Sequence, residues 1–275
     1  MNTKIIANTK NLVAALEQVE KIIDTKSSNY LLRSAFIQAE DGKMKISANN
    51  LEVIGCKTIN CIADDKIMFA LEDVKRVIKA LKYFKGCDTI ITFESDKACN
   101  FEDGKKSFKA GITDVNDNDA HSLFAHLGKV WIDNINSNNS NILEQHTYTK
   151  WEAAIPCSFS SEFEFEKKNM LENLKYLKEI KTNKTMDMFA IKNNGLVSPY
   201  GSVDIEGLNI SETSGYSLTR FMEAVKNLED DRIKMLHSGA LKPIIFKNVE
   251  ENKYNSQLML LMPVRLNDGM STWYK

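Results

Sequence analysis

The sequence predicts an α+β fold in which one domain occurs twice. Two observations support this. Segments whose apolar residues repeat every three or four positions alternate with short runs typical of strands. The same order of segments then returns in the second half of the chain. With 275 residues and 43% apolar content, the chain is long enough for two ordinary domains, each with its own core.

The first half begins with a predicted strand, Lys4–Ala7, and a helix over Lys10–Asp24 that we expect Thr9 to cap. One stripe of that helix is apolar, through Leu12, Leu16, Val19 and Ile23. Asp41-Gly42 predicts a tight hairpin turn. The other predicted elements of this half are the strands Ser34–Glu40, Lys43–Ala48, Val53–Ile62, Ile67–Leu71, Thr89–Glu94 and Ala98–Ala110, and a helix over Glu72–Lys85.

A polar stretch from about Thr113 to Lys150 separates the halves. Five of the nine residues from Asp133 to Asn141 are asparagine, which is typical of a loop or linker. Lys129–Ile132 and Tyr148–Ile155 are also compatible with strands. The predicted organisation is therefore a first domain over 1–125, a linker with possible strands over 126–150, and a second domain over 151–275.

The second half repeats the order of the first. We predict helices over Lys168–Lys181 and Thr219–Glu229, and the strands Glu162–Phe165, Met186–Lys192, Ser202–Ile210, Arg232–Leu236, Leu241–Lys247 and Gln257–Arg265. Letters match as well, at a shift of about 150 positions: Lys10-Asn11-Leu12 corresponds to Lys168-Asn169-Met170, and Phe69-Ala70-Leu71 to Tyr216-Ser217-Leu218. Chance agreement of apolar periodicity is the alternative to a true repeat.

Composition excludes several classes of protein. The net charge of −1 neither indicates nor excludes binding to nucleic acid, because basic residues can gather on one face. No apolar run is long enough for a membrane span, and the N-terminus lacks the apolar core of a signal peptide, so we expect a cytoplasmic protein without membrane contact. The five cysteines lack zinc-site spacing, so we expect mostly buried free thiols.

Enzyme signals are absent from the sequence. It contains no glycine-rich phosphate loop, no GxSxG and no HExxH pattern. Its four histidines, His121, His126, His146 and His237, are scattered, and we expect them at the surface. Nothing assembles a nucleophile, a base and an orienting group, so we expect neither catalytic residues nor a cofactor or metal. An unrelated α+β enzyme for a small molecule is the weakest alternative.

Basic residues gather on the polar sides of the predicted helices. On a helical projection, Lys75, Lys79 and Lys82 lie opposite Val77, Leu81 and Phe84. The candidate DNA-binding residues on the four helices and in the segment after the first one are Lys10, Lys21, Lys26, Lys75, Arg76, Lys79, Lys82, Lys168, Lys175, Lys178, Arg220 and Lys226. Such a surface would contact phosphates without reading bases. Solubility alone is the alternative explanation for each single helix.

Three stretches resemble the bacterial DNA polymerase III beta subunit, the sliding clamp. Leu32–Gly55 resembles the family's first-domain double strand, with a "DG" turn and Asn50-Leu51-Glu52 close to its "DLE" signature. Tyr216–Leu228 resembles a strand and helix of the last domain. Leu258–Leu266, LMLLMPVRL, resembles the C-terminal strand and its "MPxRL" motif, the most specific of the three.

The resemblance implies repeated clamp domains that form a ring on oligomerisation, each with two helices packed on antiparallel sheets. Family chains have three such domains, whereas this sequence has room for two; the missing one corresponds to the middle domain. A ring of six domains then requires a head-to-tail homotrimer, with edge strands paired between neighbours. The implied function is a processivity factor that encircles double-stranded DNA and tethers a polymerase, with Lys26 matching a basic position of the family's lumen.

The resemblance also implies a pocket for short peptides of polymerases and clamp loaders. The matching positions are Leu241, Pro243, Leu260, Met262 and Pro263. Part of the family's pocket comes from the missing middle domain, and Leu123, Phe124 or Trp131 are candidates for its replacement. Ordinary strand core is the alternative for Leu260 and Met262. A clamp-like adaptor or decoy that binds such peptides without encircling DNA is the second hypothesis for function.

Overall fold

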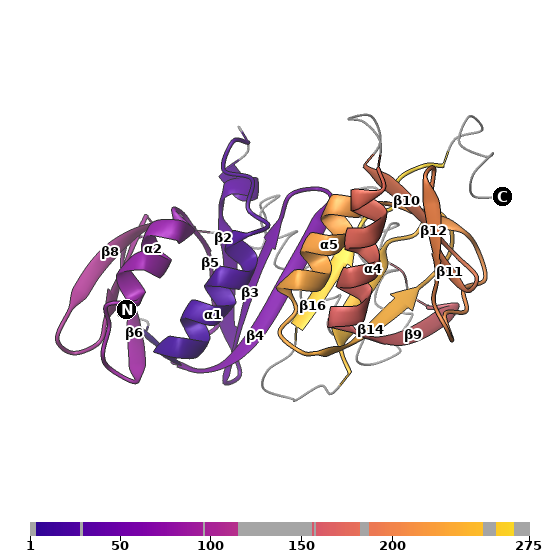
Figure 1. Ribbon diagram of the computed structural model, residues 1–275. Coiled ribbons are helices and arrows are strands. Elements are labelled where there is room, and N and C mark those ends of the chain that lie inside the picture. Colours follow the sequence, from indigo (N-terminus) through magenta and orange to yellow (C-terminus); the bar gives the residue numbers. More distant parts are fainter. Residues whose placement is uncertain are drawn as a thin grey trace, which may run out of the picture. The chain divides into compact units, whose positions relative to one another are not determined.

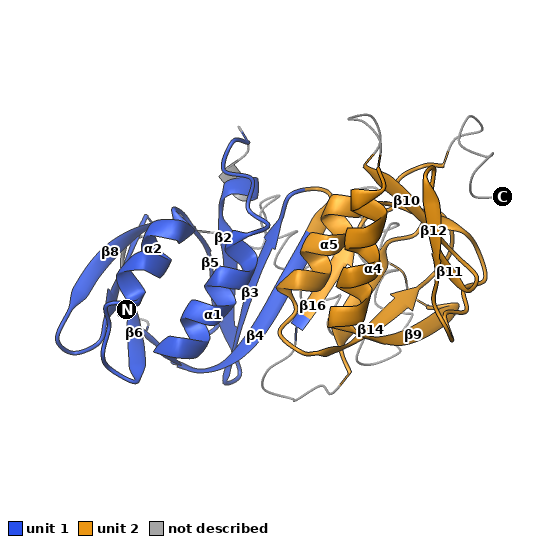
Figure 2. Cartoon of the chain, viewed as in Figure 1, with its two compact units in different colours: residues 1–50, 54–130, 251–257 blue, residues 51–53, 131–250, 258–275 orange. Residues whose placement is uncertain are grey.

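The computed structural model describes residues 4–27, 30–95, 97–114, 156, 158–181, 187–249 and 257–266. The chain forms two compact units (Figure 2). Unit 1 comprises residues 1–50, 54–130 and 251–257, and unit 2 comprises residues 51–53, 131–250 and 258–275. The predicted linker over 126–150 lies outside the described residues. So do the two segments that are compatible with strands and the predicted boundaries at 125 and 151.

In its described residues, unit 1 combines two helices with eight antiparallel strands, and Figure 1 shows their arrangement. The strands follow the order β1-β6-β7-β8-β5-β2-β3-β4, and β1 also pairs with β4. Its elements are β1 (Lys4–Asn8), α1 (Thr9–Glu20), a 3-10 turn (Tyr30–Arg33), β2 (Ala35–Glu40), β3 (Lys43–Asn49), β4 (Val53–Ala63), β5 (Ile67–Leu71), α2 (Val74–Leu81), β6 (Asp88–Ser95), β7 (Ala98–Glu102) and β8 (Ser107–Asp114).

The described strands of unit 2 form two antiparallel arrays, ordered β9-β14-β15-β16 and β12-β11-β10-β13. Its elements are β9 (Ser161–Glu166), α4 (Lys167–Glu179), β10 (Met188–Lys192), β11 (Gly195–Ser198), β12 (Gly201–Asp204), β13 (Ser214–Ser217), α5 (Leu218–Asn227), β14 (Arg232–His237), β15 (Ile244–Asn248) and β16 (Gln257–Leu261). The described residues are thus mixed helix and sheet, and the predicted α+β class is confirmed.

One topology occurs in both units. In chain order each unit runs strand, helix, four strands, helix, three strands. The pairings also correspond: β1-β6-β7-β8 matches β9-β14-β15-β16, and β5-β2-β3-β4 matches β13-β10-β11-β12. Within each unit the two helices contact each other, α1 with α2 and α4 with α5. Agreement at this level supports a true internal repeat over coincidence of apolar periodicity.

The hairpin between β2 and β3 forms where the sequence predicts it. Asp41 and Gly42 both have positive φ, at 50° and 76°, which matches the twist of the flanking strands. The helical stripe is confirmed at Leu12, Leu16 and Val19, which are fully buried, whereas Ile23 lies beyond the end of α1 and is only half-buried.

Several predicted boundaries are wrong. Asn8, not Thr9, caps α1: its side chain accepts a hydrogen bond from the amide of Asn11, while the Thr9 hydroxyl bonds to Thr89. Ala98–Ala110 is two strands, because Asp103 makes a turn by accepting hydrogen bonds from the amides of Lys105 and Lys106.

In unit 2 the differences are larger. The predicted strand Ser202–Ile210 ends at Asp204, and Gly195–Ser198 and Ser214–Ser217 are strands that the sequence did not predict. The strand predicted from Leu241 begins at Ile244, and the one predicted to end at Arg265 ends at Leu261. Two-residue turns separate the short strands in the region around Ser202. Pro243 and Pro263 stand at the last two boundaries, and a proline has no amide hydrogen with which to continue strand pairing.

The core of unit 2 centres on α5. The ring of Phe221 meets Phe189 and Phe246 edge to face, with centroids 5.1 Å and 4.8 Å apart. The helix therefore has a fixed buried side, which leaves its polar side to carry other functions.

Candidate nucleic-acid interface and peptide-binding surface

The lysines predicted on unit 1 are at its surface. Lys10 on α1, Lys21 at its end and Lys26 in the following turn are exposed. The amide of Lys26 donates to Asp24 Oδ1 at 3.0 Å, which fixes the backbone of this turn. On α2, Lys75 and Lys79 are exposed, whereas Val74, Val77, Ile78 and Leu81 are buried. The amphipathic pattern thus places lysines on the side away from the core.

Arg76 and Lys82 differ from these lysines because carboxylates neutralise them. Arg76 Nε donates to Asp73 Oδ2 at 2.9 Å. Lys82 Nζ lies 2.6 Å from Glu17 Oε1, and this ion pair joins α2 to α1. Both pairs are more than half exposed on the basic side, so their contribution to stability is small.

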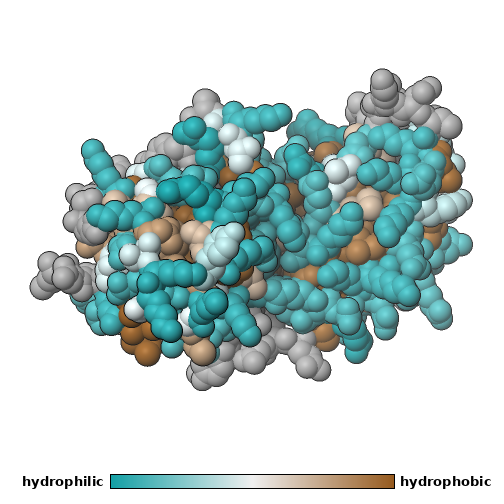
Figure 3. Space-filling view, turned by 60° about the vertical axis from the view of Figure 1, so that its left-hand side comes forward, coloured by the Kyte–Doolittle hydropathy of each residue, from teal (hydrophilic) through white to brown (hydrophobic). Residues whose placement is uncertain are grey.

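Unit 2 carries its lysines in the same way. Lys168, Lys175 and Lys178 on α4 are exposed, while Met170, Leu174 and Leu177 are buried. Lys226 near the end of α5 is exposed too. Hydrophilic side chains dominate the surface in the space-filling view, with apolar residues in smaller patches (Figure 3).

The repeat reveals one difference in charge between the units. Aligning the buried stripes of α1 and α4 puts Lys175 where unit 1 has Glu17. The match of Phe69-Ala70-Leu71 with Tyr216-Ser217-Leu218 puts Lys226 where unit 1 has Lys79. The carboxylate that neutralises Lys82 in unit 1 is therefore replaced by a lysine in unit 2.

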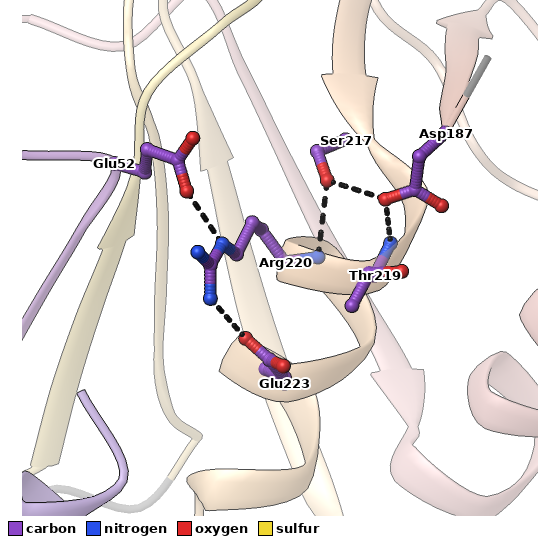
Figure 4. A network of polar contacts seen from close by, with 6 residues as sticks. All are labelled: Glu52, Asp187, Ser217, Thr219, Arg220 and Glu223. Atoms are coloured by element: carbon purple, nitrogen blue, oxygen red, sulfur yellow. Dashed lines mark hydrogen bonds and ion pairs between the residues drawn. The ribbon is translucent and has the colours of Figure 1, made fainter. Parts of the chain in front are cut away.

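Arg220 lies between two carboxylates (Figure 4). Its Nε donates to Glu52 Oε2, and its Nη1 donates to Glu223 Oε2 at 3.0 Å. Partial burial disfavours the charged guanidinium, but the two carboxylates outweigh that effect and raise the pKa of Arg220. Both carboxylates belong to unit 2, since that unit includes residues 51–53. Arg220 therefore offers less free charge to a phosphate than the unpaired lysines do.

The start of α5 is held by a second set of polar contacts in the same view (Figure 4). Ser217 Oγ accepts from the amide of Arg220 at 3.2 Å and donates to Asp187 Oδ2 at 2.9 Å. Asp187 Oδ2 also accepts from the amide of Thr219 at 3.0 Å. Partial burial would raise the pKa of Asp187, but these hydrogen bonds and the charge of Lys181 hold it below its usual value.

The residues expected to bind a peptide differ in burial. Leu241 is 62% exposed, Met262 and Pro263 are half-buried, and Pro243 is buried. Leu260, at 1% exposure, lies in the core of β16, as the strand-core alternative expects. Leu123, Phe124 and Trp131 lie outside the described residues.

The segment after β16, Met262–Leu266, is fastened at three points within unit 2. The amide of Met262 donates to the carbonyl of Glu52 at 2.9 Å. The amide of Val264 donates to the carbonyl of Gly215 at 2.9 Å. Leu266 packs over Gly215 so closely that a Cβ there would lie 2.6 Å from Leu266 Cδ2.

His237 corrects the expectation of surface histidines. It is fully buried, and its Nε2 shares a hydrogen bond with Ser214 Oγ. Burial lowers the pKa of His237, and the charge of Glu212 opposes this only in part. In β14, His237 points to the same face of the strand as buried Ile233 and Met235. This alternation could have predicted that His237 is buried. The other three histidines lie outside the described residues.

The cysteines behave as the sequence predicts. Cys56, Cys61 and Cys99 are buried free thiols, and Cys87 is an exposed one. Burial raises the pKa of Cys56 and Cys99 to about 12 and that of Cys61 to about 11, so these thiols stay protonated. Cys157 is not among the described residues. Within the described ranges, no group of three or more His, Cys, Asp or Glu side chains is placed to hold a metal ion.

Sequence reasoning missed the carboxylates that decide which basic residues are free. Glu17 and Asp187 lie in no motif, and the signature that contains Glu52 does not identify Arg220 as its partner. Alignment of the two repeats was the available signal for Glu17, because it shows a carboxylate in one copy and a lysine in the other. No helix in the described part of the chain is long and apolar enough to cross a membrane.

Comparison with known proteins finds likeness in structure but not in sequence. No protein-family model matches the chain, and no curated protein does either. Among solved structures, the DNA polymerase sliding clamp from Pseudomonas aeruginosa with ligand superposes with a TM-score of 0.69 at 9% identity, over 96% of this chain and 66% of that chain. Another structure of that clamp gives a TM-score of 0.68 at 9% identity, over 96% of this chain and 67% of that one.

A third solved structure, the DNA polymerase III subunit beta from the same organism, gives a TM-score of 0.69 at 10% identity, over 96% of this chain and 66% of that one. The chain thus spans about two thirds of the length of the clamps that it matches. The two repeated units, each with two helices on antiparallel sheets, have the fold of DNA sliding-clamp domains.

Proposed function

We propose that this chain is the subunit of a DNA sliding clamp, a processivity factor that encircles duplex DNA and tethers a replicative polymerase. The observation that carries the proposal is the repeat of one module, whose helix pair bears exposed lysines in both copies. Matching about two thirds of a clamp chain supports two modules for each subunit. A six-module ring is then a head-to-tail homotrimer, with modules 1–125 and 151–275 joined by 126–150.

The proposed ring holds DNA by charge and by topology. Lysine ammonium groups attract phosphates without reading bases, so binding is independent of sequence and weakens as salt rises. A closed ring stays on DNA even when each contact is weak, which allows it to slide. This role requires no catalytic group, cofactor or metal, and it suits a cytoplasmic replication protein.

The DNA contacts that we propose are exposed lysines without a carboxylate partner among the described residues: Lys10, Lys21, Lys26, Lys75, Lys79, Lys168, Lys175, Lys178 and Lys226. Arg76, Lys82 and Arg220 are secondary, because each already pairs with a carboxylate. Salt bridges to the protein compete with phosphates for the same charge.

Polymerase and clamp loader would bind through short peptides at a surface formed by Leu241, Met262 and Pro263. Leu241 and Met262 offer apolar area at the surface of unit 2. Changing both residues to alanine should weaken binding of a clamp-motif peptide while the fold persists. Unchanged affinity would assign these side chains to the unit's own packing.

Two measurements test the proposal directly. Electron micrograph class averages should show rings, and native mass should be three times the 31.2 kDa of one chain. Charge reversal at Lys26, Lys75 and Lys79 should abolish DNA-dependent stimulation of a polymerase while rings persist. A DNA-indifferent monomer at low salt would contradict the ring.

The alternative is a clamp-like adaptor or decoy that binds clamp-motif peptides without encircling DNA. Its motivation is that the chain covers only 66% of the clamp chain that it matches. The charge-reversed variant separates the two functions. An adaptor would keep its full function after this change, because it does not encircle DNA. A sliding clamp would lose its DNA-dependent stimulation of a polymerase.

A further inference from the structure

Leu51 stands in an unusual backbone conformation beside the Met262–Leu266 segment. Its φ is 73°, in the left-handed region that a residue with a bulky side chain rarely adopts. Its side chain is 47% exposed, so burial does not compensate for the strain. Such a conformation persists only where surrounding contacts fix the backbone on both sides.

Glu52, the next residue, supplies contacts of that kind in two directions. Its carboxylate accepts from Arg220 Nε on α5 (Figure 4). Its carbonyl accepts from the amide of Met262 at 2.9 Å. One residue thus connects the helix, the strained turn and the first residue of the Met262–Leu266 segment.

Arg220 is itself held in place for this contact. Its backbone amide donates to Ser217 Oγ at the start of α5, and its Nη1 donates to Glu223 Oε2 one turn along. The guanidinium is therefore fixed on the helix before it meets Glu52.

We infer that Arg220 is a positioning residue: by holding Glu52 it sets the turn onto which the amide of Met262 docks, and so shapes the surface proposed to bind peptides. The role of that surface in binding peptides rests on the proposed function. The effect of Arg220 on the hydrogen bond from Met262 to Glu52 does not, and it can be tested without any ligand.

The first test follows amide hydrogen exchange at single residues in the full chain. The exchange rate of the Met262 amide should rise by roughly three- to tenfold in Arg220→Gln and in Glu52→Gln. The effect is limited because both side chains of the ion pair are partly exposed. Arg220→Lys keeps the charge and should restore part of the protection. The amide of Val264, which bonds to Gly215 on β13, serves as an internal reference and should change less.

Glu223→Gln is the matched control, because it removes a carboxylate from Arg220 without touching Glu52. It should speed the exchange of Met262 much less than Arg220→Gln does, because Arg220 keeps its own contact with Glu52. Equal acceleration by Glu223→Gln and Arg220→Gln, or no acceleration by Arg220→Gln, would overturn the inference.

A second test measures binding of a clamp-motif peptide to the same variants. Arg220→Gln should weaken it several-fold, and Arg220→Lys should do so less. If the wild-type chain does not bind the peptide, the proposed peptide surface is wrong, whereas the exchange result still decides the role of Arg220. If the peptide binds and Arg220→Gln binds it equally well, the positioning role fails.

Discussion

Asp187 shows how one side chain fixes the start of a helix. Its carboxylate accepts from Ser217 and from the amide of Thr219, and so extends the cap that Ser217 provides for α5. An N-cap residue of this kind contributes about 1 kcal/mol. Because the contacts favour the ionised carboxylate, its folded-state pKa is below the ordinary value of 3.8.

Stability at acid pH should therefore depend on Asp187. A lowered pKa contributes stability that is present above 3.8 and is lost as pH falls through the lower, folded-state value. Asp187→Asn keeps an acceptor oxygen but removes the charge. Between about pH 6 and about pH 3, the urea midpoint of the variant should fall less than that of the wild type. Parallel curves would show that Asp187 does not contribute to the pH dependence.

Gly215 matters because of what lies over it. A Cβ at this position would lie 2.6 Å from Leu266 Cδ2 and 3.0 Å from the carbonyl oxygen of Val264. Gly215→Ala should therefore displace Met262–Leu266 from β13 and destabilise unit 2 by about 1–3 kcal/mol. Faster exchange of the Val264 amide is the direct readout.

Gly111→Ala is the matched control for that substitution. Its added Cβ would lie no closer than 3.4 Å to Glu72 Oε2, which is near ordinary contact. The variant should leave the Val264 amide unaffected. Comparable effects of the two substitutions would refute the packing argument.

At the scale of elements, the helix pairs of the two units differ in charge more than in shape. The buried stripes correspond, yet Glu17, which pairs with Lys82 in unit 1, corresponds to Lys175 on α4. The α4–α5 pair therefore lacks a carboxylate that partly neutralises the α1–α2 pair.

Charge exchange at this one position tests that idea. In the proposed clamp, Lys175→Glu replaces a cation with an anion, so the slope of log affinity against log salt for duplex DNA should fall by roughly one per subunit. Glu17→Lys is the reciprocal change and should steepen the slope. Changes of the same sign, or no change, would separate these helices from DNA binding.

At the scale of the whole molecule, β12 is an edge strand. In the described part of the chain it pairs with β11 alone. The two strands are joined by a two-residue turn after Ser198, so Ser198 and Gly201 form the hydrogen-bonded pair. The next residue, Ser202, then directs its N–H away from β11, toward a strand that could be added.

Proline at position 202 should therefore block assembly without unfolding the unit. Ser202→Pro removes an outward donor, which an edge strand tolerates, but it prevents pairing with a neighbouring chain. If the proposed homotrimer forms, its native mass should fall from three chains to one with Ser202→Pro and should stay at three chains with Ser202→Ala. A trimer that persists with proline would assign the interface to another edge.

Local features of the chain were enough to predict much of the fold. The spacing of Leu12, Leu16 and Val19 predicts the buried side of α1, and Asp41-Gly42 predicts the hairpin between β2 and β3. Both predictions succeed because periodicity and turn chemistry act over a few neighbouring residues. The order of elements, repeated along the chain, similarly predicted the α+β class. Short strands such as Ser214–Ser217 escaped because four residues carry too little pattern.

Only the tertiary structure decided which charges are free and which side chains are buried. Arg220 and Glu52 are 168 positions apart, and no local pattern joins them. The same holds for the pairing of Lys82 with Glu17 and of His237 with Ser214. Local spacing sets which face of an element a residue occupies, whereas its charge partner depends on segments that only folding brings together.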